Sequence, residues 1–165
     1  LLVTWVGHHT RKEPKVLMHI RDLRQEDLYD VLHLCKKFYK KAKFEDLGKL
    51  NQEKTLQYIV SLLNNPETLC KVVEDDGEIE GFAAFALVES PFSDSIIGYE
   101  LFFWLNTKNP FTAKKIIKEY EEWAKEKGCI AVRFGSIHAL EDEKFISFIT
   151  RQGFHKKETF FIKGI

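Results

Sequence analysis

Hydrophobic and polar residues follow two patterns along the chain, one typical of strands and one typical of helices. The middle of the chain has the strand pattern. Apolar runs over 68–74, 79–88 and 96–105 are rich in β-branched and aromatic residues, which predicts three strands. The sequence Asp-Asp-Gly-Glu at 75–78 separates the first two runs and predicts a hairpin, because glycine tolerates a positive φ. The run 79–88 is almost continuously apolar, which is typical of a strand buried on both faces.

Helical spacing is found on both sides of these strands. After a short strand at 20–23, apolar residues at helical intervals predict one helix that opens at 24–27 and another capped by Asn51. The core-facing positions expected in these two helices are Leu28, Val31, Leu32, Cys35, Phe38 and Tyr39, then Leu56, Ile59, Val60 and Leu63. The remaining expected elements are a helix over 112–127 ended by Gly128, a strand over 129–134, a helix over about 141–151 and an exit strand over 157–163.

This order of elements predicts the fold class. A helix that connects two neighbouring strands implies a right-handed crossover. We therefore expect an α/β fold with a mixed, mostly antiparallel central sheet, flanked by helices on both faces. The 165 residues suit one domain, which we place at 18–165, starting at Met18, the only methionine. Residues 1–17 are interpreted as an N-terminal extension or an expression-derived arm.

Composition narrows the function classes. The 25 basic and 25 acidic residues balance, so no nucleic-acid partner is expected from the total charge. The low net charge mildly favours self-association, so a homodimer is a prediction. No apolar run approaches the ~20 residues that span a membrane, and no membrane partner is expected. The three cysteines, Cys35, Cys70 and Cys129, are dispersed in apolar patterns, which predicts buried thiols, no metal site and a cytoplasmic protein.

The end of the chain carries a more specific signature. From 68 onward the expected order is strand, strand, strand, helix, strand, helix, and the last helix leads into Gly153-Phe154. Asp142, Phe145, Ile149 and Gly153-Phe154 follow one another at intervals of three, four and four residues. This order and spacing resemble the GNAT family of N-acetyltransferases, whose signature has Asn, Ala and Tyr at those three places. The resemblance covers about residues 18–165.

The resemblance implies an acyl-CoA N-acyltransferase fold and an enzyme that transfers acetyl from acetyl-CoA, its co-substrate, to a primary amine. The acceptor would be a small-molecule or protein amine. The alternative is a catalytically inactive relative that keeps the fold and binds a partner. Ile149 stands where family members often have the tyrosine that protonates the leaving thiolate, so water, another side chain or the substrate would have to do so.

The resemblance also assigns cofactor-binding positions. In the family, backbone amides at the end of the strand equivalent to 96–105 hold pantetheine, and amides at the next helix N-terminus hold pyrophosphate. These positions are, in this sequence, Leu105 and Asn106, followed by Lys108, Asn109, Phe111, Thr112 and Ala113. Phe111 stands where the family pattern has glycine, and its side chain either blocks the phosphates or points away. The simpler interpretation of this segment is a loop with Thr112 as the helix N-cap.

Acetyl transfer to an ammonium group needs a general base. Glu100 follows Gly98-Tyr99 among apolar neighbours that would raise its pKa, and it is the candidate catalytic residue. The alternative is that Glu100 lies at a strand edge and faces solvent. His138 is the second candidate base, and Asp142 is interpreted as a helix cap.

Two further groups of residues are interpreted structurally. The lysines at 36, 37, 40, 41 and 43 cluster near the end of a predicted helix, where cations favour the negative helix terminus and solvent, so no binding patch is assigned. The aromatic residues Phe102, Phe103 and Trp104 alternate across a strand and are assigned to the core.

Overall fold

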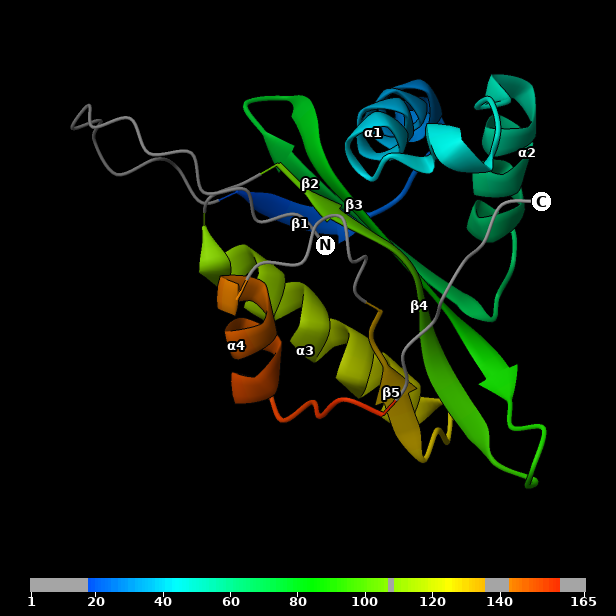
Figure 1. The fold of residues 1–165 in the computed structure, drawn as a ribbon, viewed down its shortest axis with the longest axis vertical. Helices are drawn as coiled ribbons and strands as arrows, with labels where there is room; N and C mark the ends of the chain where they lie inside the picture. Colours follow the sequence, from blue (N-terminus) through cyan, green and yellow to red (C-terminus); the bar gives the residue numbers. More distant parts are fainter. Residues whose placement is uncertain (1–17, 107–108, 136–142, 158–165) are drawn as a thin grey trace.

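The computed structural model describes residues 18–106, 109–135 and 143–157 of the 165-residue chain. A five-stranded sheet in the order β1-β2-β3-β4-β5 forms the centre of the molecule (Figure 1). Its strands are β1 (His19–Asp22), β2 (Thr68–Asp75), β3 (Glu78–Glu89), β4 (Ile96–Leu105) and β5 (Ala131–Arg133). Neighbouring strands pair antiparallel, except β4 and β5, which are parallel because α3 connects them.

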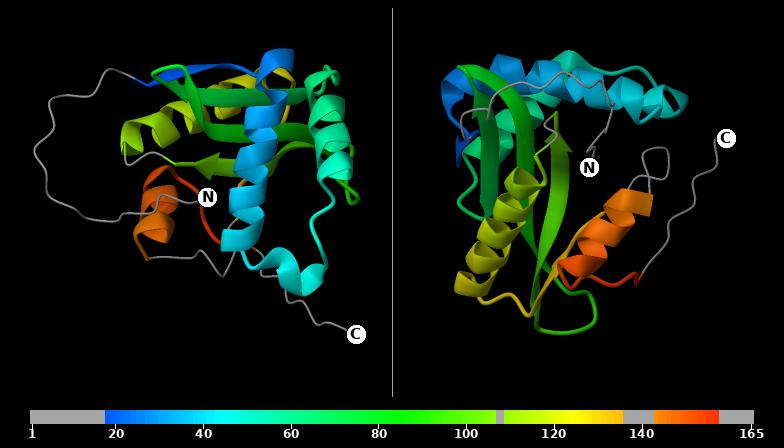
Figure 2. Two further views of the ribbon diagram at one scale, coloured as in Figure 1. Left: turned by 90° about the horizontal axis from the view of Figure 1, so that it is seen from above. Right: turned by 90° about the vertical axis from the view of Figure 1, so that its left-hand side faces the viewer.

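Helices cover both faces of the sheet. The helices are α1 (Leu28–Lys41), α2 (Gln52–Leu63), α3 (Pro110–Glu126) and α4 (Glu143–Arg151), with 3₁₀ turns at Gln25–Asp27 and Phe44–Leu47. Helices α1 and α2 lie on one face, and α3 and α4 lie on the other (Figures 1 and 2). The predicted mixed, mostly antiparallel sheet with helices on both faces is therefore confirmed.

Each face has its own hydrophobic core. The core on the α1 face contains Val31, Ile59, Phe82, Ala84 and Trp104 among its buried residues. The core on the α3 face contains Ala83, Phe85, Phe103, Ile116 and Tyr120. Strand β3 contributes to both cores, which confirms the interpretation of its apolar run as a strand buried on both faces.

The predicted turns and caps are mostly confirmed. Asp76 and Gly77 have φ of 53° and 84°, so the hairpin between β2 and β3 has the positive φ values that an Asp-Gly turn supplies. Gly128 ends α3 with φ of 80°, and the Asn51 side chain accepts from Lys54 N–H at the start of α2. The strand expected over 129–134 is shorter in the structure, where β5 has only three residues.

Several predictions concern residues outside the described ranges. They are the arm at 1–17, the first two residues of the helix expected from 141, and nearly all of the exit strand over 157–163. Within the described ranges, no helix is both long and apolar enough to cross a membrane. No cluster of three or more potential metal ligands occurs in the same part of the chain. Cys35 and Cys70 are buried and Cys129 is half-buried, and all three are free thiols.

Candidate active site

The candidate site begins where the pairing of β4 and β5 ends. The two strands pair from Ile97 opposite Ala131 to Tyr99 opposite Arg133. Strand β4 then continues from Glu100 to Leu105, and no described strand pairs with this stretch on the side away from β3. We call that side of residues 100–105 the open edge of β4.

A β-bulge lies at the start of the open edge. Ala84 pairs with Phe102 and Phe85 pairs with Glu100, so Leu101 is an extra residue on β4. Both Leu101 and Phe102 pack against the core on the α1 face, as expected when a bulge places two successive side chains on one side. The bulge therefore changes which β4 residues turn their backbone toward the open edge.

The hydrogen bonds that flank the bulge define this change. Before it, Ile130 N–H donates to the Ile96 carbonyl at 3.0 Å, so even-numbered residues of β4 face β5. After it, Asn106 N–H donates to the Glu80 carbonyl at 2.7 Å, so even-numbered residues now face β3. Because antiparallel pairs alternate, the N–H and C=O groups of Phe103 and Leu105 face the open edge.

Of the two amides expected to hold pantetheine, this geometry leaves only one facing the open edge. Leu105 faces the open edge, as that role requires. Asn106 does not fit the role, because its N–H is used by Glu80 and its side-chain amide also donates to the Glu80 carboxylate at 2.6 Å. Phe103 takes its place as the second backbone donor on this edge. The sequence could not reveal this exchange, since residues 101–105 are all apolar and nothing in their pattern marks a bulge.

Glu100 lies at the point where β4 and β5 separate. Its side chain is half-buried, and its Oε2 accepts from Gly135 N–H at 3.1 Å, so it does not simply face solvent from a strand edge. Burial raises the pKa of this carboxyl, while the Gly135 hydrogen bond and the charge of Arg133 oppose the rise. A Cβ at position 135 would lie 3.0 Å from Oε2, so glycine there leaves room for the carboxylate.

A second pair of side chains spans β4 and β5 beside Glu100. The Arg133 guanidinium lies over the Tyr99 ring, 4.5 Å from its centroid, and donates to the Tyr99 hydroxyl. The Tyr120 hydroxyl of α3 donates to the Arg133 carbonyl at 3.1 Å. Sequence reasoning did not assign Arg133, Tyr99 or Gly135 to the site, because their relation to Glu100 arises only from the register of β4 and β5.

The amino end of α3 differs from the expectation in its cap. Helix α3 begins at Pro110, and Asn109 is the N-cap; the assignment of Thr112 to that role is wrong. The Asn109 side chain accepts from Phe111 N–H at 3.0 Å, and its carbonyl accepts from Thr112 N–H at 3.2 Å. Pro110 has no N–H. The groups that would bind pyrophosphate at residues 110–112 are therefore absent or already used.

The side chains at this end are also placed. Phe111 is 76% exposed, so of the two expectations for its side chain the structure supports the one in which it points away. Thr112 and Ala113 are buried and belong to the packed side of α3. Lys108, His138 and Asp142 lie outside the described residues, so their expected roles stay predictions.

No protein-family model matches this chain, and no curated protein matches it in sequence. Solved structures share its fold. A predicted acetyltransferase from Clostridium acetobutylicum, solved with acetyl-CoA, has a TM-score of 0.68 at 14% identity over 90% of this chain and 96% of that one. AAC(6')-Iy, solved with the bisubstrate analog CoA-S-monomethyl-acetylneamine, has a TM-score of 0.67 at 18% identity, with 91% and 99% covered.

A third similar structure has a different description. A transcriptional regulator from Bacillus halodurans C-125 has a TM-score of 0.65 at 13% identity, covering 90% of this chain and 100% of that one. At such identities the likenesses show the fold alone: this chain has the acyl-CoA N-acyltransferase fold that the order of its elements predicted. A fold does not determine an activity, so the function has to be argued from the site.

Proposed function

We propose that this protein transfers an acetyl group from acetyl-CoA to a primary amine. The observation that carries the proposal is the bulge at Leu101, which turns the backbone of Phe103 and Leu105 to the open edge directly beside Glu100. An extended ligand pairs well with such an edge, because backbone donors and acceptors alternate along it. The solved acetyltransferases with acetyl-CoA or a CoA bisubstrate analog have the same fold, which supports this choice of ligand.

In the proposed reaction Glu100 is the general base. An ammonium group cannot attack a thioester, so the Glu100 carboxylate takes a proton from the acceptor, directly or through one water. A raised pKa suits this role, because the carboxylate then holds the proton better near neutral pH. Only the charged form accepts a proton, so activity falls as the pH drops through the Glu100 pKa.

Backbone groups supply the rest of the catalysis. Donors on the open edge position the thioester and stabilise the oxyanion that develops on its carbonyl oxygen. Ile149 in α4 has no hydroxyl that could protonate the leaving thiolate, so we assign this protonation to water or to the acceptor amine, whose nitrogen loses a second proton as the amide forms.

The two ends of coenzyme A fit this site unequally. Pantetheine fits the open edge at Phe103 and Leu105. The pyrophosphate would need free N–H groups at the start of α3, but those of Phe111 and Thr112 already donate to Asn109. We assign the phosphates to the charge of Lys108 and to the rest of the segment 108–113.

The second candidate function is binding without catalysis. The capped amino end of α3, with Pro110 at its first position, and Ile149 in place of a tyrosine favour it. In that case the fold would serve a protein or small-molecule partner. The acceptor class, a homodimer and the cytoplasmic location remain proposals, and the three free cysteines support a reducing compartment.

Calorimetric titration with acetyl-CoA and with free coenzyme A tests the proposal. We expect saturable binding by the full chain, weakened about tenfold or more by Lys108→Glu, which reverses the charge beside the phosphates. Lys125→Glu, near the far end of α3, is the matched control and should bind normally. Absence of binding at millimolar cofactor would reject the transferase and leave the binding protein.

Turnover is measured separately. A panel of amines, with release of free thiol as the readout, should identify acceptors that depend on Glu100. If cofactor binds but no amine in the panel is acetylated, the binding protein is again the better account.

A further inference from the structure

Tyr120 of α3 carries a hydroxyl into the interior of the molecule. Its side chain is completely buried, and its ring stacks on that of Phe85 with the centroids 3.9 Å apart. A phenylalanine would keep this packing without a polar group to satisfy, and a buried hydroxyl that lacks a partner costs free energy. The hydroxyl has a partner, because it donates to the Arg133 carbonyl of β5 at 3.1 Å. Core packing alone therefore does not account for a tyrosine at this position.

A glycine in β4 leaves room for the hydroxyl end of this ring. Gly98 pairs with Val132 of β5, one residue before Arg133. A Cβ at position 98 would lie 3.0 Å from both the hydroxyl oxygen and Cε2 of Tyr120. Carbon atoms pack best at about 3.5 Å or more, so a side chain at position 98 would displace the hydroxyl from the Arg133 carbonyl.

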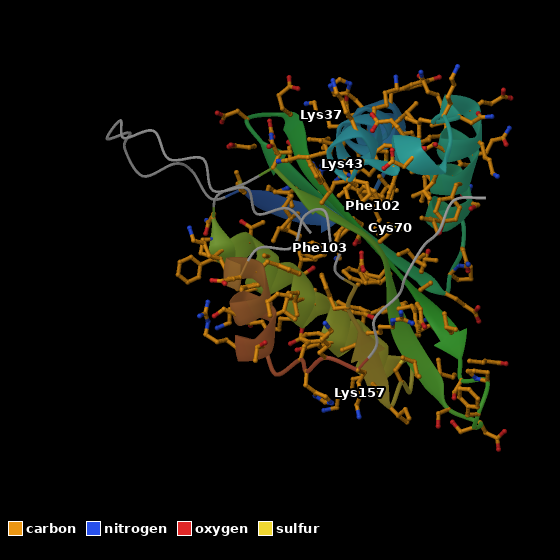
Figure 3. All side chains as sticks on the ribbon, in the orientation of Figure 1. Lys37, Lys43, Cys70, Phe102, Phe103 and Lys157 are labelled. Carbon is orange, nitrogen blue, oxygen red and sulfur yellow. The ribbon has the colours of Figure 1, made fainter. Side chains whose placement is uncertain are left out.

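Glu100 lies on the same face of the sheet as Tyr120. Side chains alternate along a strand, so Glu100 points to the same face as position 98, where a Cβ would meet Tyr120. Phe85, which pairs with Glu100, belongs to the core on the α3 face. Beyond the bulge, Phe103 is the next β4 residue that packs in this core, on the α3 side of the sheet (Figure 3). The base and the buried hydroxyl are therefore neighbours on one face.

The backbone after β5 connects the two groups. The Arg133 carbonyl belongs to a planar peptide unit, so fixing this carbonyl fixes the direction in which the chain leaves β5. The Phe134 ring then packs edge-on against Phe103, with the centroids 4.9 Å apart. In the next peptide unit, Gly135 N–H donates to Glu100 Oε2 at 3.1 Å. The hydrogen bond that holds the base therefore follows directly on the peptide unit that Tyr120 holds.

Tyr120 keeps its proton while Glu100 titrates. Burial raises the pKa of the Tyr120 hydroxyl, and the charge of Glu100 adds to the rise. In the described part of the chain, Arg133 of β5 and Cys129 before it are the other titratable groups that act on these two side chains. Tyr120 can therefore affect Glu100 through position, and not through a change in its own charge.

We infer that Tyr120 is a positioning residue for Glu100, because its hydroxyl fixes the Arg133 carbonyl and thereby the strand end that presents Gly135 N–H to the base. This inference rests on the proposed function, which takes Glu100 as the general base. Because Tyr120 is buried, it acts through β5 and not on the ligands. Without the hydroxyl, the Gly135 bond to the carboxylate should weaken. That bond stabilises the charged form, so its weakening should raise the Glu100 pKa.

Tyr120→Phe, which keeps the ring and its stack on Phe85, tests the inference without turnover. Two NMR signals of the isotope-labelled full chain report on Glu100. They are its own carboxyl carbon and the amide of Gly135, which responds to the ionisation of the carboxylate that it donates to. Glu100→Gln identifies both signals, because it abolishes both titrations. We expect Tyr120→Phe to raise the Glu100 pKa by about one pH unit and to reduce the response of the Gly135 amide.

Tyr39→Phe is the matched control. The Tyr39 hydroxyl of α1 also donates to a backbone carbonyl, that of Phe44 at 2.8 Å, on the opposite face of the sheet from Glu100. Each variant loses one such bond, so both should lower the melting temperature by a few degrees. Tyr39→Phe should leave the Glu100 pKa unchanged. Gly98→Ala keeps the Tyr120 hydroxyl but displaces it, so it should raise the Glu100 pKa as Tyr120→Phe does.

Acetyl transfer to an acceptor from the amine panel gives a second readout. The kcat of Tyr120→Phe should fall roughly tenfold, because a misplaced base loses its alignment with the acceptor, while KM for acetyl-CoA stays the same. The pH at which transfer reaches half its maximum should move upward together with the Glu100 pKa. A rise in KM for acetyl-CoA with kcat unchanged would assign Tyr120 to cofactor binding and overturn the inference.

The titrations can also overturn it. An unchanged or lowered Glu100 pKa in Tyr120→Phe would show that the hydroxyl does not hold the carboxylate in place. An equal rise in Tyr39→Phe would show that the effect comes from a general loosening of the fold. Because the NMR titrations need neither cofactor nor acceptor, failure of this inference stays distinguishable from failure of the proposed transferase.

Discussion

The open edge of β4 and the amino end of α3 lie next to each other in the chain, yet they leave very different hydrogen-bonding capacity for a ligand. At the open edge, a bulge at Leu101 turns the backbone of Phe103 and Leu105 away from β3. At the amino end of α3, Asn109 and Pro110 leave no free N–H at residues 110–112. The difference teaches that adjacent segments of one fold can differ widely in the backbone donors that they leave free, and that a single cap is enough to occupy those of a helix terminus.

The largest loss of transfer activity is expected from a substitution at the open edge. Glu100→Gln keeps the size of the side chain and removes the base, so transfer should fall by about 10²- to 10⁴-fold while acetyl-CoA binding is unchanged. Steady-state kinetics and calorimetry on the same preparation check it. Glu89→Gln, an exposed change at the other end of β3, is the control. Equal activity of Glu100→Gln and the unaltered chain would remove Glu100 from the mechanism.

A smaller effect should follow from crowding the base. In Gly135→Val the new Cβ would lie 3.0 Å from Glu100 Oε2 and would displace the carboxylate. We expect transfer to fall roughly tenfold, because a misplaced catalytic group loses its alignment with the acceptor. Because position 135 is exposed, the melting temperature should barely change. A large loss of stability with normal specific activity of the folded fraction would contradict this account.

The pH dependence of acetyl transfer tests the same region of the molecule. The charge of Arg133 lowers the Glu100 pKa, against the upward effect of burial. Arg133→Gln should therefore raise that pKa further, and the pH at which transfer reaches half its maximum should move upward. The measurement is a pH–rate profile with one acceptor, compared with Arg151→Gln, an exposed change in α4. A midpoint that stays in place or moves down would show that Glu100 does not control the profile.

The smallest effect is expected at the amino end of α3. Asn109→Ala removes the cap, which should destabilise the fold by about 1 kcal/mol. The same change frees the Phe111 N–H, so acetyl-CoA should bind a few-fold more tightly, since helix N-termini favour anions. Thermal melting and calorimetry measure the two effects separately. Weaker binding at full folding would mean that Asn109 itself holds the ligand.

The sequence predicted the framework of this comparison but not its details. The bounds of β4 were predicted correctly because a largely apolar run of ten residues, with Glu100 its one charged residue, lies between a turn and a polar loop. The bulge was not, since Leu101 and the residues that follow it in the strand are all apolar and give no break in the pattern. At α3, Thr112 was chosen as the cap although Asn109 followed by Pro110 is the stronger signal, because proline favours the first helical position.

Glu100 could be nominated from sequence, but its surroundings could not. Gly135 lies 35 residues away in sequence and meets Glu100 only because β4 and β5 pair in parallel. Local patterns carry no information on such a register. For the same reason the contact of Lys41 with Trp104 was not predicted, and the lysines of α1 were all interpreted as solvated.

Hydrogen exchange of individual amides, with and without acetyl-CoA, tests the central claim most directly. The claim is that Phe103 and Leu105 face the open edge and receive the ligand, whereas Phe102 and Trp104 donate to β3. Acetyl-CoA should slow exchange at Phe103 and Leu105 and leave the slow exchange of Phe102 and Trp104 unchanged. Unchanged exchange at Phe103 and Leu105 with bound cofactor would contradict the account.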